Sequence, residues 1–193
     1  IAKGSERACY SYPNDFSKVI KVIYSQGTHN NQNELEYIYM NYLVKKNTDL
    51  SLLTKCYGYI DTNLGKGVVF DRVLDNDLTP SKSFRYYLAQ KIISVSEQKS
   101  LLSDLQEYLV ENDILFIDTS LTNLFCHRIS EDKYKLIIVD GLGAKRMGMK
   151  FWLYRNISLY AKYKMKRQWL KLIKMYEQDV KRVEIGKRPI TRV

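Results

Sequence analysis

The most informative segment of the chain is residues 112–143, NDILFIDTSLTNLFCHRISEDKYKLIIVDGLG. It contains two short apolar runs, and the aspartates Asp118 and Asp140 follow them directly. An aspartate at the end of a buried strand holds its charge at the edge of the core, where a metal ion or a reacting group can reach it. Asn123 lies between the two aspartates, five residues after the first. The pattern therefore predicts a magnesium site formed by side chains of this segment.

The same residues suit phosphoryl transfer. This reaction needs oxygen ligands on Mg²⁺ and a carboxylate near the attacking hydroxyl, because positioning and charge neutralisation provide most of its catalysis. Asn123 and Asp140 offer metal ligands, and Asp118 stands where a catalytic base would act. The competing interpretation is an ordinary hairpin with polar turn residues, since D-x4-N alone is a weak motif. The D-G-x-G sequence that begins at Asp140 makes this competing interpretation less favoured.

Hydrophobic patterning predicts the surrounding elements. Runs rich in β-branched and aromatic residues, bounded by polar turns, indicate strands, and apolar residues at helical spacing indicate helices. The predicted strands are residues 16–24, 52–60, 67–73, 114–117, 124–126 and 134–139, and the predicted helices are residues 34–46, 84–93 and 96–112. A content of 45% hydrophobic residues is enough to form a substantial core.

Taken together, these segments resemble the protein-kinase-like fold and, within it, the family described as PhoP regulatory network protein YrbL. The segments that carry the resemblance, in chain order, are KGSERACYSYP, KVIKVIY, ELEYIYMNYL, YGYIDTNLGKGVVFDRV, DTSLTNLFCHRI and IIVDGLG. The resemblance implies an α+β, two-lobed fold. Residues 1–75 would form an N-lobe with a small antiparallel sheet and one helix. Residues 76–193 would form a reduced, mostly helical C-lobe with the catalytic-loop hairpin and basic, aromatic C-terminal helices.

The resemblance also implies ATP and Mg²⁺ as cofactors and assigns residues to the nucleotide. Gly4 and Ser5 would be the remnant of the loop that covers the phosphates, where small residues let backbone N–H groups approach. Lys21 would pair with the phosphates. Glu34 would orient Lys21 through an ion pair, with Glu36 as the competing choice. Each assignment has an alternative. Gly4 and Ser5 would simply begin a hairpin, and Lys21 would be a solvated lysine on a strand. Glu34 would be a glutamate that the helix dipole favours near a helix N-terminus.

The basic residues are concentrated at the end of the chain. Residues 144–193 contain 15 Lys and Arg but only three acidic residues, and aromatic and aliphatic residues interleave with the basic ones. This pattern predicts basic amphipathic helices. Such a surface attracts phosphate-rich partners, and we expect an anionic membrane surface in preference to nucleic acid. In the alternative interpretation, the aromatic residues pack on the second lobe and the lysines stay solvated.

Cysteine usage and hydropathy bear on the compartment. The three cysteines, Cys9, Cys56 and Cys126, have no C-x-x-C spacing, and no apolar run reaches the roughly 20 residues that span a bilayer. We therefore expect a reduced, cytoplasmic protein that associates peripherally with the inner membrane through its basic end.

Three functional hypotheses follow. The first is an atypical kinase-like enzyme that transfers a phosphoryl group from ATP, with Mg²⁺, to an acceptor that the sequence does not identify, in a bacterial envelope or cation-stress response. The second is an inactive pseudokinase or scaffold that binds nucleotide, because Phe116 and Ile117 replace the His-Arg of protein kinases and Ser120 replaces their catalytic-loop lysine. The third is a basic adaptor that binds membrane or RNA.

Overall fold

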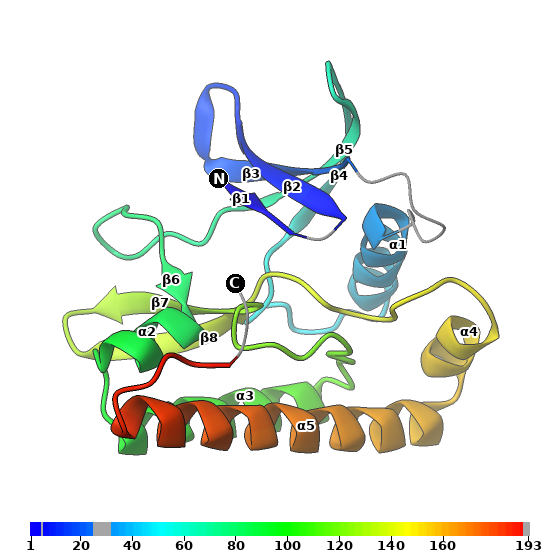
Figure 1. The fold of residues 1–193 in the computed structure, drawn as a ribbon. Helices are drawn as coiled ribbons and strands as arrows, with labels where there is room; N and C mark the ends of the chain where they lie inside the picture. Colours follow the sequence, from blue (N-terminus) through cyan, green and yellow to red (C-terminus); the bar gives the residue numbers. More distant parts are fainter. Residues whose placement is uncertain (5, 25–31, 191–193) are drawn as a thin grey trace.

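A computed structural model describes residues 1–4, 6–24 and 32–190 of the chain. Figure 1 shows a small sheet and one helix in the upper part of the molecule and a second, mostly helical part below it. The longest helix, α5 (Ser158–Glu184), runs along the base of the lower part. The fold is thus α+β with the two-part arrangement that the sequence predicts.

The upper part is built on an antiparallel sheet with the strand order β1-β2-β3-β5-β4. Helix α1 (Gln32–Lys45) covers one face of this sheet. Successive residues of β3 alternate between the faces, so Val19 lies in the main core, whereas Ile20 belongs to a small apolar cluster on the other face. The strands are β1 (Ala2–Lys3), β2 (Arg7–Tyr12), β3 (Asp15–Ile23), β4 (Cys56–Thr62) and β5 (Gly65–Asp71).

The lower part combines helices with a second, three-stranded sheet of order β6-β7-β8. Helices α2 and α3 begin at the N-caps Ser83 and Ser94, whose side chains accept hydrogen bonds from backbone N–H groups of the first turn. Helix α2 ends where Lys91 adopts a left-handed conformation. The remaining elements are β6 (Lys82–Ser83), α2 (Phe84–Gln90), α3 (Val95–Glu111), β7 (Leu124–Ser130), β8 (Lys133–Ile138) and α4 (Met149–Asn156).

Two predicted strands differ from the structure. Residues 114–117 are fully buried, but they form only one isolated bridge, between Phe116 and Leu142. The ladder stops there because the N–H groups of Ile117 and Asp118 both donate to the carbonyl of Gly141. The strand predicted over residues 52–60 begins only at Cys56.

Residues 52–54 instead join the two parts of the molecule. The N–H of Ile138 donates to the carbonyl of Leu52 over 2.9 Å, and the N–H of Thr54 donates to the carbonyl of Ile138 over 3.2 Å. The hydrophobic core is also continuous, since one cluster includes Phe70 of the first sheet and Leu105 of α3. The end of β8, where Asp140 follows, is therefore held in a fixed position below the first sheet.

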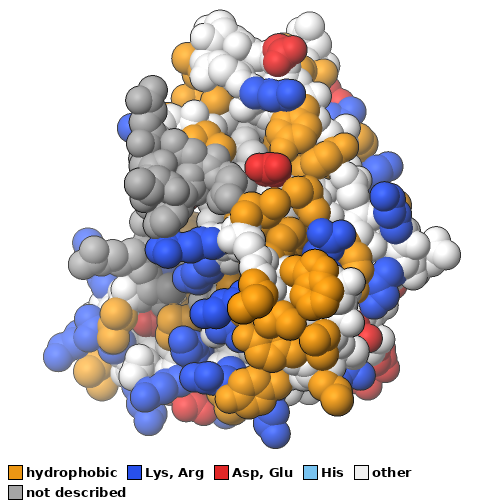
Figure 2. Space-filling view, turned by 90° about the vertical axis from the view of Figure 1, so that its right-hand side faces the viewer, with side chains coloured by type: hydrophobic (Ala, Val, Ile, Leu, Met, Phe, Trp, Pro, Cys, Tyr) orange, Lys and Arg blue, Asp and Glu red, His pale blue; other side chains and the backbone are white. Residues whose placement is uncertain are grey.

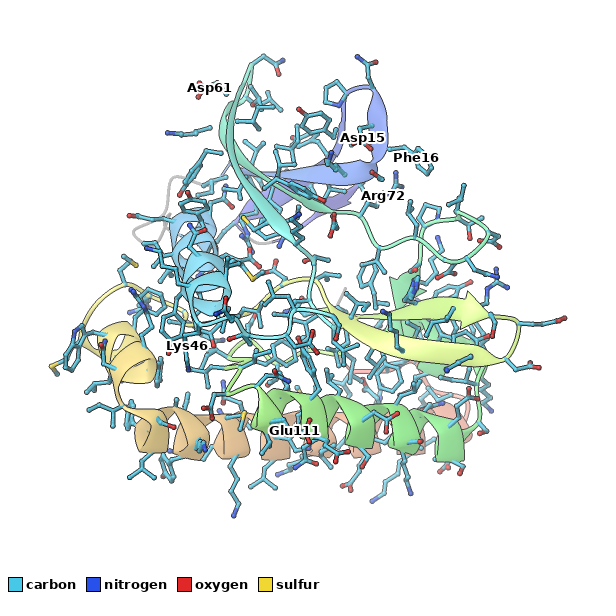
Figure 3. All side chains as sticks on the ribbon, turned by 180° about the vertical axis from the view of Figure 1, so that it is seen from behind. Asp15, Phe16, Lys46, Asp61, Arg72 and Glu111 are labelled. Atoms are coloured by element: carbon cyan, nitrogen blue, oxygen red, sulfur yellow. The ribbon has the colours of Figure 1, made fainter. Side chains whose placement is uncertain are left out.

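The hairpin predicted for the catalytic-loop segment is confirmed, since β7 and β8 pair as antiparallel strands. In Figure 3, Asp15 and Asp61 mark two further hairpin tips at the top of the molecule, and Arg72 marks the chain as it leaves β5 toward the lower part. Within the described residues, no helix has both the length and the hydropathy to span a bilayer.

Candidate active site

A buried lysine lies at the centre of the candidate site. Lys21 of β3 places its Nζ 3.1 and 3.0 Å from the two carboxylate oxygens of Glu36, and 2.7 Å from the carbonyl oxygen of Val139. The same ammonium lies 4.2 Å from the centre of the Phe70 ring. Lys18 faces the opposite side of the strand and pairs with Asp15 at 2.7 Å. Of the two strand lysines, Lys21 is thus the one that points between the two parts of the molecule.

The expectation that Glu34 pairs with Lys21 is wrong. Glu34 is exposed, and the ion pair is made by Glu36, whose side chain is 5% exposed. Two residues correspond to a rotation of about 200° around a helix, so only one of the two glutamates can face the sheet. The structure places Asn33 on the sheet side, where its Nδ2 donates to the Lys21 carbonyl at 2.9 Å. This anchor sets the rotation of α1 that directs Glu36 toward Lys21.

A second cation, Arg7 of β2, was not expected in the site. Its guanidinium donates to Glu36 Oε2 at 2.7 Å, to Asn33 Oδ1 at 3.1 Å, and to Asp140 Oδ1. Burial opposes the charge of Arg7, but Glu36 and Asp140 outweigh this and raise its pKa. The only signal for Arg7 in the sequence is a charged residue beside the short apolar run Ala8-Cys9-Tyr10. Two cations and two carboxylates therefore balance one another.

Asp140 lies two residues after the end of β8 and faces Lys21 and Arg7. Its Oδ1 accepts from Arg7 and from the N–H of Gly141 at 2.7 Å, while its Oδ2 lies 3.9 Å from Lys21 Nζ. Burial alone would raise the pKa of Asp140, but Lys21 and Arg7 together hold it below its usual value. The side chain is 36% exposed. Asp140 is thus ionised and oriented, with Oδ2 turned away from the Arg7 contact.

Gly141 brings Asp118 and Asn123 next to Asp140. Its φ is +89°, and a Cβ there would lie 2.8 Å from the Asp118 carbonyl oxygen and 3.2 Å from Asn123 Nδ2. That nitrogen donates to the same Asp118 carbonyl at 2.9 Å. Only glycine tolerates both this backbone conformation and this close approach. The three residues predicted from the sequence therefore come from two loops, on either side of the β7–β8 hairpin, that meet at Gly141.

The Asp118 carboxylate faces solvent and contacts a lysine. Its side chain is 58% exposed, and Oδ1 lies 2.7 Å from Nζ of Lys145. Lys145 was not predicted as a site residue. It follows the D-G-L-G sequence closely and places a positive charge beside Asp118, whereas Ser120, at the position of the catalytic-loop lysine, supplies none. Its position depends on how the chain turns after Gly143, which short motifs do not report.

The side-chain oxygens of Asp140 and Asn123 suit a Mg²⁺ ion that also binds the phosphates of a nucleotide. Across the part of the chain that the structure describes, no group of three or more His, Cys, Asp or Glu side chains is arranged to hold a metal ion. Magnesium commonly takes only one or two protein oxygens and completes its shell with water and phosphate oxygens. Asp140 Oδ2 is one such oxygen. Asn123 offers a second in its Oδ1, since Nδ2 is the atom that donates to the Asp118 carbonyl.

Gly4 lies in the turn between β1 and β2, where its N–H donates to the Arg7 carbonyl at 2.8 Å. Its predicted partner Ser5 lies outside the described residues. The turn leads into the strand that carries Arg7, so it is close in sequence to the charged cluster. A role of Gly4 in covering phosphates stays a prediction.

A separate hollow of about 270 Å³ lies between the two hairpin tips of the first sheet. It is lined by residues including Pro13, Ile20, Val22 and Leu64. Ile20 and Val22 belong to the sheet face opposite Lys21. This hollow is therefore distinct from the charged cluster, and its size does not make it the nucleotide site.

A strand lysine paired with a helix glutamate, beside a strand-end aspartate and a D-x4-N turn, places the chain in the protein-kinase-like class of folds. Rad53 in complex with AMP-PNP matches with a TM-score of 0.54 at 12% identity, over 100% of this chain and 52% of that chain. The PknI kinase domain of Mycobacterium tuberculosis matches with a TM-score of 0.46 at 12% identity, over 70% and 52%. The chain spans about half the length of these solved proteins.

The family is shown by a direct match. The family model described as PhoP regulatory network protein YrbL matches residues 1–177, and the chain belongs to this family. A protein of Escherichia coli K12 described as "Uncharacterized protein YrbL" is 29% identical over 146 residues, which are 74% of this chain and 70% of that protein. A Shigella flexneri protein with the same description matches to the same extent.

Proposed function

We propose that this protein is an ATP- and Mg²⁺-dependent phosphotransferase of the kinase-like class. The observation that carries the proposal is the position of Lys21, whose ammonium lies between Glu36 and Asp140. Asp118 and Asn123 contact the glycine that follows Asp140. An amine from β3, an oriented carboxylate at Asp140 and an exposed carboxylate at Asp118 are the parts that phosphoryl transfer requires.

The residues of this chain would divide the reaction between them. Lys21 would bind the phosphates of ATP, and Glu36 would keep its ammonium in place. Asp118 would accept the proton of an acceptor hydroxyl, whose oxygen then forms a bond to the γ-phosphorus. The bond from the γ-phosphorus to the β–γ bridging oxygen breaks, and ADP leaves with that oxygen. Mg²⁺, held by Asn123 and Asp140, would neutralise phosphate charge.

Lys145 favours a second candidate function, nucleotide binding without transfer. The Lys145 ammonium lies 2.7 Å from Asp118 Oδ1, so it occupies one of the two carboxylate oxygens that an acceptor hydroxyl would need to reach. Both side chains are largely exposed, so the pair is held weakly and can separate. The contact therefore supports either a pseudokinase or an enzyme in which Lys145 moves onto a phosphate during the reaction.

Membership in the family supports a role in a bacterial envelope or cation-stress response, and we place the activity in the cytoplasm. Cytoplasmic ATP is the phosphoryl donor of this proposal. Cys9, Cys56 and Cys126 are free thiols, as expected for a reducing compartment. The acceptor would carry a hydroxyl group that can reach the exposed Asp118.

Turnover of labelled ATP tests the proposal, with release of ADP and labelling of the protein itself as readouts. Asp118→Asn should lower turnover about a hundredfold or more, the usual contribution of a general base. Asp132→Asn changes an exposed aspartate in the β7–β8 turn and should leave turnover unaltered. Equal turnover in the Asp118→Asn variant would contradict the assignment. MgATP binding without any turnover in the unaltered protein would favour the pseudokinase.

A further inference from the structure

The outer face of α5 carries large apolar side chains that nothing in the described structure covers. Leu159 is 81% exposed, and Tyr163 and Leu170 are also exposed. Their spacing of four and seven residues places them in one row along the helix. The opposite face, with residues such as Leu172 and Tyr176, is buried against the core. The helix therefore has a packed face and a second, exposed apolar row.

Helix α4 extends this surface. It lies beside the beginning of α5, and the two helices are joined by the stacked rings of Tyr154 and Tyr160, whose centres are 5.3 Å apart. Met149 of α4 is 77% exposed, and Trp152 is exposed as well. Figure 2 looks onto this side of the molecule, where hydrophobic and basic side chains alternate over the lower part. Exposed residues this large and this close together indicate a contact surface rather than scattered exceptions.

The charged residues that α4 and the first part of α5 contribute to this surface are all basic. Residues 141–176 contain ten Lys and Arg and no Asp or Glu. Burial and then the neighbouring charges of Lys171, Arg167 and Lys150 lower the pKa of Lys164, so these cations lie within electrostatic reach of one another. Lys166, Arg167 and Lys174 are exposed beside the apolar row. The row is thus flanked by cations that have no acidic neighbours in the sequence.

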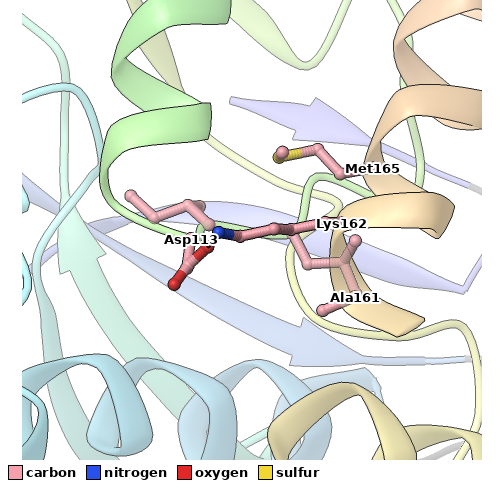
Figure 4. Close-up of a pocket in the computed structure, with 6 residues that line it drawn as sticks. Asp113, Ala161, Lys162 and Met165 are labelled. Atoms are coloured by element: carbon pink, nitrogen blue, oxygen red, sulfur yellow. Dashed lines mark ion pairs between the residues drawn. The ribbon is translucent and has the colours of Figure 1, made fainter. Parts of the chain in front are cut away.

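Two of these ten cations pair with acidic residues elsewhere in the chain, namely Lys145 with Asp118 and Lys162 with Asp113; only Lys162 lies on α5. Its Nζ lies 3.4 Å from Asp113, across a narrow groove lined by Ile114, Leu115 and Met165 (Figure 4). This contact anchors α5 to the segment that leads to Asp118. Lys162 is therefore not counted among the cations of the exposed surface.

We propose that α4 and the N-terminal part of α5, together residues 149–174, form a docking surface for an anionic phospholipid membrane. The cations meet the phosphate headgroups, and Met149, Trp152, Leu159, Tyr163 and Leu170 enter the boundary between headgroups and acyl chains. A helix that lies in the membrane plane needs this combination of a basic flank and an apolar row. Nucleic acid would use the cations but leave the exposed Leu159 and Met149 in water. A second copy of the chain would bring like charges together.

Co-sedimentation of the full chain with vesicles tests the apolar row. The protein should bind vesicles that contain phosphatidylglycerol and should not bind vesicles of phosphatidylcholine alone. The double variant Leu159→Glu/Leu170→Glu should weaken binding by about tenfold or more, because it places acids in the membrane boundary. Leu64→Glu, at an exposed leucine in the β4–β5 turn, is the matched control and should bind as the unaltered protein does. All replaced leucines are exposed, and the unfolding temperature confirms that each variant is folded.

Charge removal tests the basic flank. Lys166→Gln and Lys174→Gln should each weaken binding to anionic vesicles about fivefold, whereas Lys99→Gln on α3 should have no effect. Three results would overturn the proposal: no vesicle binding at low salt, equal binding by the double leucine variant, or tight binding to single-stranded RNA without vesicle binding. Dimers in sedimentation velocity that disappear in the double leucine variant would also overturn it, since the row would then be a contact between copies.

Discussion

Arg7 donates a hydrogen bond to Asp140, a residue 133 positions later in the chain. The contact ties the first sheet to the end of β8 and leaves Oδ2 of Asp140 outside the guanidinium fork. Because Arg7 also contacts Glu36, one side chain holds the helix glutamate and the strand-end aspartate together. Arg7 thus acts as a positioning residue, since the groups proposed to contact the nucleotide and the metal ion are Lys21 and Asp140.

Replacement of Arg7 should destabilise the protein. The side chains of Arg7 and Glu36 are 11% and 5% exposed, and removal of one partner of a buried ion pair typically costs about 3 kcal/mol. We expect Arg7→Met to lower the free energy of unfolding in urea by roughly this amount. Arg7→Lys keeps the positive charge but not the several N–H donors of the guanidinium group, so its loss of unfolding free energy should be intermediate. An Arg7→Met protein as stable as the unaltered protein would show that the contact is incidental.

The two glutamates of α1 provide a matched pair of variants. Glu36→Gln removes the carboxylate that binds Lys21 and Arg7, and we expect it to lower both stability and affinity for MgATP. The stability cost should be about 1–3 kcal/mol, as for a buried group left poorly satisfied. Glu34→Gln should change neither quantity, because Glu34 is exposed. A larger effect from Glu34→Gln than from Glu36→Gln would contradict the site geometry.

Asp140 should contribute to the acid sensitivity of the fold. Its pKa is held below the usual value of 3.8, so the unfolded state binds the proton more readily than the folded state does. The stabilising contribution is therefore present above pH 3.8 and is lost as pH falls through the lower folded pKa. Asp140→Asn should flatten the dependence of the free energy of unfolding on pH in this acid range. Urea titrations at neutral and acid pH measure this, and an unchanged acid slope would contradict the assignment.

Gly143 should resist substitution more strongly than a glycine in open space. A Cβ at Gly143 would lie 2.7 Å from the ring of Tyr39, and φ is +79°. Gly186 has a similar φ of +74° but no atom within 4 Å of such a Cβ. Gly186→Ala should thus cost about 1 kcal/mol for the left-handed backbone alone. Gly143→Ala should cost about 2 kcal/mol more, because the packed ring must move. If Gly143→Ala and Gly186→Ala lowered the free energy of unfolding in urea by the same amount, the Tyr39 ring would be shown to move without cost.

The sequence predicted several of the helices and strands and the residues of the turn around Gly141. Strand and helix periodicity located β3, α1 and the β7–β8 hairpin, and D-x4-N with D-G-x-G identified Asp118, Asn123 and Asp140. These are local patterns, and local spacing determines which side chains an element or a turn presents. Alternation along β3 places only one of Lys18 and Lys21 on the inner face, and the resemblance to the kinase-like fold selected Lys21.

The remaining site residues depend on information that is not local. The choice between Glu34 and Glu36 depends on the rotation of α1, which is set by the contact of Asn33 with the Lys21 carbonyl. Arg7 and Lys145 enter the site through contacts with distant parts of the chain or through the path of a loop. Residues 52–54 have the composition of a strand, but their backbone hydrogen bonds go to Ile138 of β8 and not to β5. A segment that joins two sheets can pair with either one, and its composition does not tell which.

Binding of MgATP tests the central claim most directly, namely that Lys21 and Asp140 hold a magnesium-bound nucleotide. Calorimetric titration should show one saturable site that requires Mg²⁺. Lys21→Met should weaken binding about tenfold or more, since a charged contact to phosphate is lost. Asp140→Asn should weaken the dependence on Mg²⁺, and Lys18→Met, on the other face of β3, should leave binding unaltered. The claim would be contradicted if the unaltered protein did not bind MgATP at millimolar concentration. It would also be contradicted if the Lys21→Met and Asp140→Asn proteins bound MgATP as tightly as the unaltered protein does.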